Sequence, residues 1–455
     1  MYDILVVGAG LSGLQAATTA HQAGKSVLVV EARDRVGGKT WSVPLASGRG
    51  SVEFGAAWIN DTNQRRMWAY AQQFGLEMVT QSVEGKCVML EEGGETHIFP
   101  FGKSPNFSAE EVADLERIRD MIHDASMKTY NLAEEDSMTL AEYVTKHKGC
   151  EKTQKMVNLW TRVMIGCEHT ECTAGFFIDY ARRGGGLMQM RSDSKHGGQY
   201  LRFKTGSQSV AKGIAVRLPK NSVRLSTPVV AIDDKKAHVV VTSTTGEAFK
   251  AKKVIISLPT PLYKDVNFSP PLPAAKDLVT SSTFLGTYTK VILCYDEPWW
   301  LEAGYSGLTL AFEGPVAVAR DTSVAANKQF SLTCFVNGEP GRTWSKLPQH
   351  ERRAQVLAQI ATMYGEHDAV YKPIEIFEQE WINEEFSKGA VCPILGDKGM
   401  LSKDAAYRQP VGNLHFVGTE FASEWKGYME GALCSGEVGG QQAVSALQES
   451  PRSKL

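Results

Sequence analysis

The N-terminal segment constrains the fold most strongly, because an apolar run, a glycine-rich turn, a helical stretch and a second apolar run follow one another there. Residues 2–7 are apolar enough for a buried parallel strand, and the turn G-A-G-L-S-G occupies residues 8–13. Residues 14–23 have a helical composition, and residues 26–30 form a second apolar run that ends at Glu31. This order predicts a strand–turn–helix–strand unit that binds a dinucleotide.

Each residue type in this unit has a mechanical reason. Gly8 permits the tight turn, Gly10 lets the backbone approach a pyrophosphate, and Gly13 lets the helix pack closely on the strand. Glu31 follows Gly10 by about 20 residues, the spacing of a carboxylate that accepts hydrogen bonds from ribose hydroxyls. A carboxylate at that position would repel a 2′-phosphate. The turn alone does not choose between FAD and NAD.

The bulk composition excludes several classes of protein. A chain of 455 residues is too long for one compact core, so two or more domains are expected. The formal net charge of -2 argues against a nucleic-acid binder. The 8 cysteines form no C-x-x-C pair and the histidines do not cluster, so we expect free thiols and no metal site. No apolar run is long enough to span a membrane.

The stretch E-A-R-D-R-V-G-G-K, residues 31–39, favours a flavin. It resembles the E-A-R-x-R-x-G-G-R stretch with which the flavin amine oxidase superfamily wraps FAD. Arg33 and Lys39 supply cations for phosphate, and Gly37 and Gly38 allow the backbone to pass close to the cofactor. Lys39 keeps the charge of the usual arginine but loses its bidentate fork.

A second resemblance lies near the C-terminus. The stretches L-H-F-V-G-T-E, residues 414–420, and W-K-G-Y-M-E-G-A, residues 425–432, are similar to the flavin-containing monoamine oxidase family. Within it, the chain resembles the soluble, peroxisomal, fungal-type amine oxidases more than the tail-anchored mitochondrial ones. The resemblance implies further FAD contacts at Gly55, Ala56, Ala57, Trp58, Val229, Gly418, Glu420, Tyr428 and Met429.

The resemblance also implies the fold. It predicts an α/β protein of the amine oxidase type, with a Rossmann-like FAD-binding domain and an α+β substrate domain. The FAD-binding domain is discontinuous and covers residues 1–76, 203–280 and 386–450. The substrate domain covers residues 77–202 and 281–385, and residues 451–455 form a targeting tail.

The implied reaction is FAD-dependent amine oxidation, in which a hydride passes from the amine α-carbon to flavin N5. The resulting imine hydrolyses to an aldehyde or ketone, and O2 is reduced to H2O2. Lys290 matches the family lysine that holds a water near N5, and Tyr428 matches one of two facing aromatic rings. Gln199 and Trp381 match residues that line the substrate pocket.

Two positions depart from the mammalian-type pattern. Ala390 stands where the family has the cysteine that links the flavin, which implies non-covalent FAD. Val391 stands where the family has the second ring, so one wall of the aromatic cage is missing. The sequence does not tell which residue replaces that ring.

The sequence indicates only the class of the substrate. No arginine follows the second glycine segment at residues 57–61 to hold an α-carboxylate, and the sequence places no acidic groups of the kind that a polyamine tunnel needs. A small monoamine, or an amine intermediate of a natural product, with O2 as co-substrate, is therefore the first hypothesis. An FAD-dependent dehydrogenase or desaturase acting on a natural-product intermediate remains an alternative, as does a non-catalytic FAD-binding scaffold. A homodimer is one assembly that the sequence leaves open.

The last three residues, Ser453-Lys454-Leu455, match the peroxisomal address. A polar stretch with a proline precedes them, which would leave the address accessible. We therefore expect recognition by the peroxisomal import receptor and a peroxisomal location.

Overall fold

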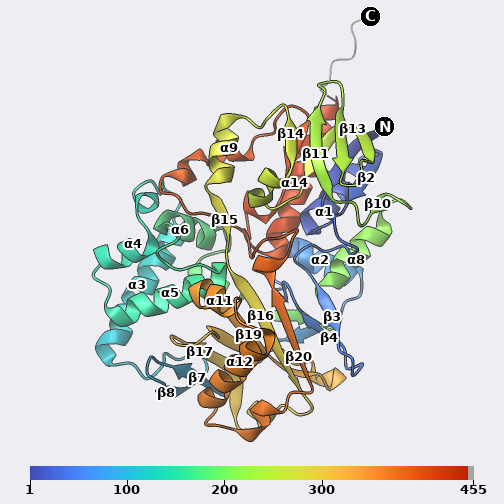
Figure 1. Cartoon of the computed structure of the whole chain (residues 1–455). Coiled ribbons are helices and arrows are strands. Elements are labelled where there is room, and N and C mark those ends of the chain that lie inside the picture. The colour runs from blue at the N-terminus through green and yellow to red at the C-terminus, as the bar shows by residue number, and fades with distance from the viewer. Residues whose placement is uncertain (449–455) are drawn as a thin grey trace, which may run out of the picture.

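The computed structural model describes residues 1–448 and is a mixed α/β protein built on two large sheets (Figure 1). The first sheet has eight strands in the order β10-β2-β1-β13-β12-β11-β14, and β22 also pairs with β13. β1, β2, β10, β13 and β22 pair in parallel, whereas β11, β12 and β13 pair antiparallel. The strands are β1 (Tyr2–Val7), β2 (Val27–Val30), β10 (Val223–Arg224), β11 (Val229–Asp234), β12 (Val239–Ser243), β13 (Ala248–Ile256), β14 (Asn267–Ser269) and β22 (Leu414–Phe416).

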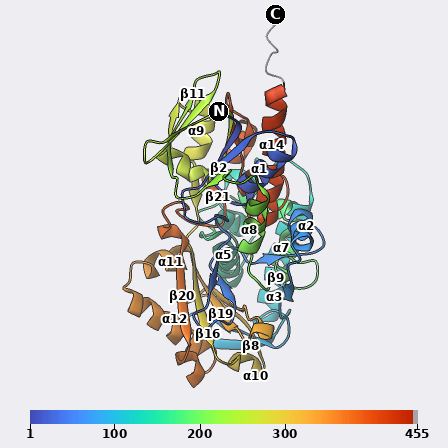
Figure 2. The ribbon, with the colours of Figure 1, turned by 90° about the vertical axis from the view of Figure 1, so that its right-hand side faces the viewer.

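Helices α1 (Leu11–Gln22) and α14 (Met429–Gln448) lie side by side against this sheet (Figure 2). Their close approach depends on glycine, since a Cβ at Gly436 would lie 2.2 Å from the carbonyl oxygen of Ser12. α1 begins at Leu11 rather than at residue 14, because the helical hydrogen bonds already start with Leu14 N donating to Gly10 O. The strand–turn–helix–strand order of the N-terminus is thus present.

Strand β11 begins at Val229, directly after Pro228. Ser226 has a φ of 50°, in the left-handed region, and Pro228 has no N–H for a sheet hydrogen bond. The residues before Val229 therefore turn away from β10 toward β11.

The second sheet has seven strands in the order β20-β16-β19-β18-β17-β7-β8. All neighbours pair antiparallel except β17 and β7. The strands are β7 (Lys86–Leu90), β8 (Thr96–Pro100), β16 (Tyr288–Tyr295), β17 (Tyr305–Ala311), β18 (Val318–Asp321), β19 (Phe330–Asn337) and β20 (Glu375–Glu380).

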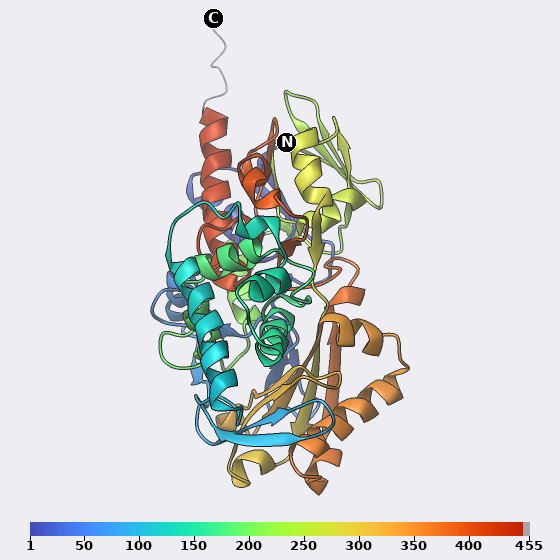
Figure 3. The ribbon, with the colours of Figure 1, turned by 90° about the vertical axis from the view of Figure 1, so that its left-hand side faces the viewer.

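Helices cover this second region on two sides (Figure 3). One group is formed by α3 (Ala109–Met127), α4 (Leu140–Lys146), α5 (Glu151–Ile165), α6 (Ala174–Arg183) and α7 (Leu187–Arg191). Capping boxes start α3 at Ser108 and α4 at Thr139. On the other side lie α11 (Gly338–Trp344) and α12 (Gln349–Met363), and α12 packs on alternate residues of β16 such as Val291 and Leu293.

Shorter strands and helices complete the fold. They are β3 (Ser42–Pro44), β4 (Ser51–Glu53), β5 (Trp58–Ile59), β6 (Met78–Thr80), β9 (Leu201–Phe203), β15 (Thr283–Leu285), β21 (Pro393–Leu395), α2 (Arg65–Gln73), α8 (Gln208–Arg217), α9 (Ala274–Ser281), α10 (Trp299–Glu302) and α13 (Asp404–Arg408).

The strands of the first sheet fall in residue ranges assigned above to the FAD-binding domain, and those of the second in the substrate ranges. β15 pairs with β21 and β5 pairs with β9, so each of these pairs crosses a predicted boundary. The boundaries themselves stay a prediction. Residues 1–448 contain no helix that is both long and apolar enough to cross a membrane. The predicted address, Ser453-Lys454-Leu455, lies outside the described residues.

Candidate active site

One cavity of about 530 Å³ is lined by residues from both regions of the molecule. Every site residue predicted above contributes to its lining except Gly13. Gly13 lies behind the wall, where a Cβ would meet the carbonyl oxygen of Gly8 at 2.0 Å. Gly13 therefore keeps α1 close to β1, as the turn motif predicts, without lining the cavity itself.

The glycines of the two N-terminal motifs meet at one end of the cavity. Gly8 has a φ of 104°, and a Cβ there would lie 3.0 Å from Ser257 O. Gly10 and Gly38 face each other so closely that a Cβ on Gly38 would lie 3.2 Å from the Gly10 Cα. Bare backbone therefore forms a cradle beside the start of α1, as an extended phosphate group requires.

Glu31 ends β2 at this cradle. Its carboxylate accepts from the backbone N–H groups of Ala9, at 2.6 Å, and Arg33, at 3.0 Å. Arg33 donates to Ser387 through Nη2, while its Nε is buried without a partner among the described residues. Nη2 of Arg35 is similarly buried and unpartnered. Unpaired guanidinium donors beside a glycine cradle fit the pyrophosphate of FAD.

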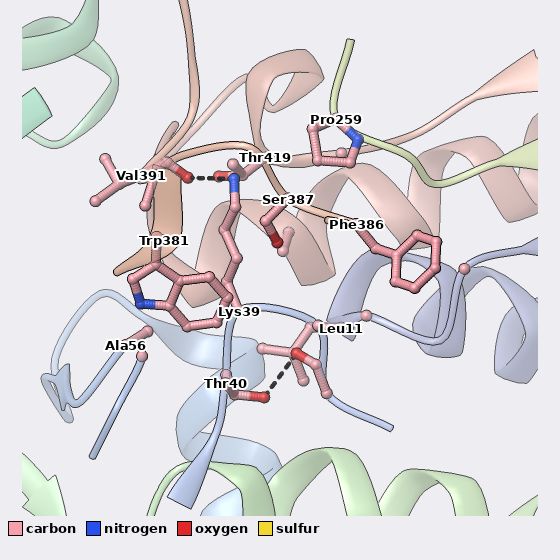
Figure 4. A pocket seen from close by; sticks show the side chains of 18 of the residues that line it. Leu11, Lys39, Thr40, Ala56, Pro259, Trp381, Phe386, Ser387, Val391 and Thr419 are labelled. Carbon is pink, nitrogen blue, oxygen red and sulfur yellow. Dashed lines mark hydrogen bonds between the residues drawn. The ribbon is translucent and has the colours of Figure 1, made fainter. Parts of the chain in front are cut away.

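Lys39 crosses the cavity next to Trp381 and Ser387 (Figure 4). Its Nζ donates to the carbonyl oxygen of Val391 at 3.1 Å. Burial lowers the pKa of Lys39 to about 8, and the nearby Glu420 opposes that fall. Trp381 is fixed by its own hydrogen bond to Phe54 O at 2.8 Å. A cation held among apolar groups in this way is available to an anionic cofactor.

The C-terminal motif forms the adjoining wall. Gly418 donates its N–H to Ser435 on α14, and Glu420 accepts from the N–H and hydroxyl of Thr260. Burial raises the pKa of Glu420. Met429 begins α14 at the cavity, so the amino end of a long helix faces the predicted cofactor position.

Lys290 lies farther along the cavity, on β16. Its Nζ donates to Gly55 O at 2.6 Å and Glu53 O at 3.2 Å. The same ammonium lies 5.4 Å from the centre of the Trp58 ring and 5.5 Å from that of Phe335. Burial lowers the pKa of Lys290 to about 8, and the Glu53 carboxylate opposes that fall. The second glycine segment therefore holds this ammonium beside two aromatic rings.

Tyr428 has aromatic neighbours on two sides. Its ring packs edge-on against Trp425 at 5.0 Å and stacks with Tyr180 at 6.5 Å and 27°. Burial raises the pKa of Tyr428, so its hydroxyl stays protonated. Gln199 lines the same wall, and its buried Oε1 has no partner among residues 1–448. The predicted ring is present, and Val391 in the lining adds no second one.

The lining also contains residues that were not predicted from the sequence, and those at the substrate end include Tyr180, Tyr288, Arg320 and Phe335. For Tyr288 a signal existed, because it precedes Lys290 by two positions in a strand and must share its face. Phe335 pairs directly with Lys290 across β16 and β19. Register of this kind becomes visible only in the folded sheet.

No group of three or more metal-ligating side chains is found within the described part of the chain.

Comparison with known proteins agrees with the geometry. Residues 11–438 match the family of flavin-containing amine oxidoreductases. The chain is 30% identical, over 100% of its length and 88% of the relative's, to amine oxidase [flavin-containing] B of Sus scrofa.

Two solved structures are similar throughout. A putrescine oxidase bound to putrescine superposes with a TM-score of 0.90 at 25% identity and covers 98% of this chain and 99% of its own. Cyclohexylamine oxidase from Brevibacterium oxydans gives a TM-score of 0.89 at 26% identity, with 98% and 100% covered. The chain belongs to the flavin-containing amine oxidoreductase family, and it is an FAD-dependent oxidoreductase that acts on amines.

Proposed function

We propose that this enzyme is an oxidase of a small monoamine, that it holds FAD non-covalently, and that it passes the electrons to O2 to give H2O2. The observation that carries the proposal is one continuous cavity, in which the glycine cradle at one end leads to Lys290 and Tyr428 at the other. When bound, FAD supplies the acceptor that takes a hydride from the amine α-carbon and delivers the electrons to O2.

The protein's own contribution begins with the amine. Tyr428, Trp58, Tyr288 and Phe335 surround the space beside Lys290 with aromatic surface. Removal of water and the nearby cation both disfavour an ammonium ion, so the bound amine loses its proton. Packing between rings then holds the α-carbon in one orientation.

Lys290 is the residue proposed to assist O2. Its ammonium is fixed by the carbonyl oxygens of Gly55 and Glu53, so little rearrangement is needed before it acts. Negative charge develops on oxygen as it accepts electrons, and a fixed cation in a dry site stabilises that charge.

Non-covalent attachment is supported by the surroundings of Ala390. Ala390 lines the cavity but carries no nucleophile. The neighbouring thiol, Cys392, is fully buried and does not line the cavity, and burial raises its pKa to about 11. A protonated, enclosed thiol is a poor nucleophile.

A monoamine is favoured over a diamine by the distribution of acids. The carboxylates in the cavity lining are Glu31, Asp265, Glu385 and Glu420. Glu31 and Glu420 belong to the FAD motifs, Asp265 pairs with Lys388, and Glu385 neighbours Phe386, which lies beneath Arg33. Among the described residues of the lining, no acid remains near Tyr428 to hold a second ammonium, unlike what a putrescine-type substrate would need.

The location is proposed from the tail. Ser453-Lys454-Leu455 is a ligand for the peroxisomal import receptor, and the peroxisome disposes of H2O2. A fluorescent fusion that keeps these residues should enter peroxisomes, and one that lacks them should not. A homodimer is a further proposal, which sedimentation of the purified enzyme tests.

The test of the proposed reaction is a peroxide assay on purified holoenzyme with benzylamine and n-alkylamines. We expect one H2O2 per amine consumed, and free FAD in the supernatant after acid precipitation. Amine-dependent reduction of an artificial dye without peroxide would instead identify a dehydrogenase. Absence of turnover with either acceptor would leave a binding scaffold, and flavin in the acid pellet would contradict non-covalent attachment.

A further inference from the structure

Arg320 places a second cation in the substrate end of the cavity. It lies on β18 and belongs to the cavity lining, and its guanidinium carbon is 5.9 Å from the centre of the Trp58 ring. Lys290 lies against the same ring at 5.4 Å. The two cations are therefore no farther apart than the sum of these distances, which is within the reach of one small molecule.

The sheet register explains why both cations face the cavity. Lys290 pairs with Phe335, and Phe335 pairs with Val318. Arg320 follows Val318 by two positions and pairs with Thr333, so it shares their face. The opposite face of the sheet packs on α12 through alternate residues, among them Ala319, the residue before Arg320.

Asp193 holds the guanidinium in place. It accepts a hydrogen bond from Nη1 of Arg320 and does not line the cavity. The Asp193 side chain is 6% exposed and that of Arg320 is 17% exposed, so the acid is the more enclosed of the two. Asp193 thus orients Arg320 from outside the cavity, and the guanidinium group of Arg320 faces the cavity.

Part of Arg320 is free to bind a ligand. Within residues 1–448, the side chain of Arg320 makes one hydrogen bond, from Nη1 to Asp193. Its Nε and Nη2 make none there and are not closed off from solvent. Arg191 also lies close enough to Asp193 to feel its charge, so this acid is shared between two cations. The local balance is positive, and a guanidinium with open donors recognises oxygen acceptors, above all a carboxylate.

We infer that Arg320 determines specificity: the preferred substrate is an amine that carries a carboxylate at the far end of its carbon chain, bound by Arg320 while the amine lies beside Tyr428. This inference rests on the proposed oxidase function and names the substrate class within it. It differs from α-amino-acid recognition, because the carboxylate must be separated from the reacting carbon by the span between Lys290 and Arg320.

The test compares matched substrates on the holoenzyme. The isomers 6-aminohexanoate and 2-aminohexanoate carry the same groups at different spacing, hexylamine lacks the carboxylate, and 1,6-diaminohexane replaces it with a cation. We expect kcat/KM for 6-aminohexanoate, or for its best homologue of shorter or longer chain, to exceed that for the alkylamine of equal length by about 10- to 100-fold. The 2-amino isomer and the diamine should be poorer substrates than hexylamine.

The variants assign this preference to one residue. Arg320→Lys keeps the charge but loses the fork, and should remove most of the preference for the carboxylate. Arg320→Met combined with Asp193→Asn removes both charges together, which avoids a lone buried carboxylate. It should lower kcat/KM for 6-aminohexanoate to about that for hexylamine measured on the same variant. Arg217→Leu is the control, because Arg217 also lies over an aromatic ring, that of Phe74, but outside this cavity.

A binding measurement separates this inference from the proposed reaction. Hexanoate, which cannot be oxidised as an amine, should perturb the flavin absorbance with a Kd about 10-fold lower in wild type than in the double variant. If no amine reduces the flavin but hexanoate binding still depends on Arg320, the proposed function fails and the carboxylate site stands. If alkylamines are oxidised as well as their amino-carboxylate partners and the variants leave both the preference and hexanoate binding unchanged, the inference is wrong.

Discussion

The two ends of the cavity are built in different ways. The cofactor end consists of backbone cradles and charged side chains from contiguous motifs, such as Gly8 to Gly10 and Glu31 to Lys39. The substrate end consists of side chains that stand far apart in the sequence and meet across β16, β18 and β19. The first end is therefore dictated by local sequence, and the second by strand register.

The two buried lysines make the contrast concrete. Lys39 and Lys290 are both enclosed, and burial lowers the pKa of each to about 8. Lys39 donates to Val391 O near the glycine cradle, whereas Lys290 donates to Gly55 O among aromatic rings. The two lysines thus have similarly lowered pKa values but lie at different ends of the cavity, so a variant of each can test whether their roles differ.

The largest effect is expected from Gly13→Val, which changes the packing of α1 on β1 behind the cofactor end of the cavity. The new Cβ would lie 2.0 Å from Gly8 O, so α1 must move away from β1. We expect the free energy of unfolding to fall by about 3 kcal/mol and bound FAD to be lost. Gly24→Ala is the control, because Gly24 also lies beside α1 with open space around it and should cost about 1 kcal/mol with FAD retained. Thermal unfolding measures the loss of stability, and flavin absorbance measures the bound FAD. A Gly13→Val protein that still binds FAD would contradict the role proposed for the glycine cradle.

The second effect separates the two lysines. Lys290→Met should slow the recovery of flavin absorbance on mixing with O2 by about 100-fold, because the fixed cation is gone, while FAD affinity is kept. Lys39→Met should weaken FAD binding by about 10-fold and leave oxygen reactivity nearly unchanged. Stopped-flow absorbance and FAD titration measure the two quantities. If both variants changed FAD affinity and the rate of flavin reoxidation equally, the proposed difference between the two ends of the cavity would be wrong.

The third effect is the pH dependence of the oxygen step. Because burial lowers the pKa of Lys290 to about 8, its cation is present below that pH and is lost above it. The rate of reaction with O2 should therefore fall by about 10-fold between about pH 7 and about pH 9. In Lys290→Met the rate should be slow and flat over this window. A rate that rises with pH in the wild type would assign the step to a different group.

The smallest effect concerns the missing ring. Val391→Tyr adds an aromatic ring to the cavity lining that also contains Tyr428, and we expect KM for benzylamine to fall by about 3-fold. Val391→Ile enlarges the side chain without a ring and serves as the control. An equal change in both variants would mean that volume, not aromatic contact, is what the position supplies.

The predictable part of the molecule follows from this contrast. The N-terminal strand–turn–helix–strand unit could be predicted, because its signals are local. The roles of Arg320 and Phe335 could not, since nothing near either residue in the sequence shows that the register of β18 and β19 brings both to the face of Lys290. Helix α1 begins at Leu11, earlier than the predicted residue 14, because part of the glycine turn already belongs to the first turn of the helix.

The central claim is that one cavity brings an amine to FAD, and an anaerobic titration of the holoenzyme with amines tests it most directly. The account predicts that a neutral amine bleaches the flavin band and that air restores it with one equivalent of H2O2. A flavin that stays oxidised with every amine, including the amino-carboxylates, would contradict the account.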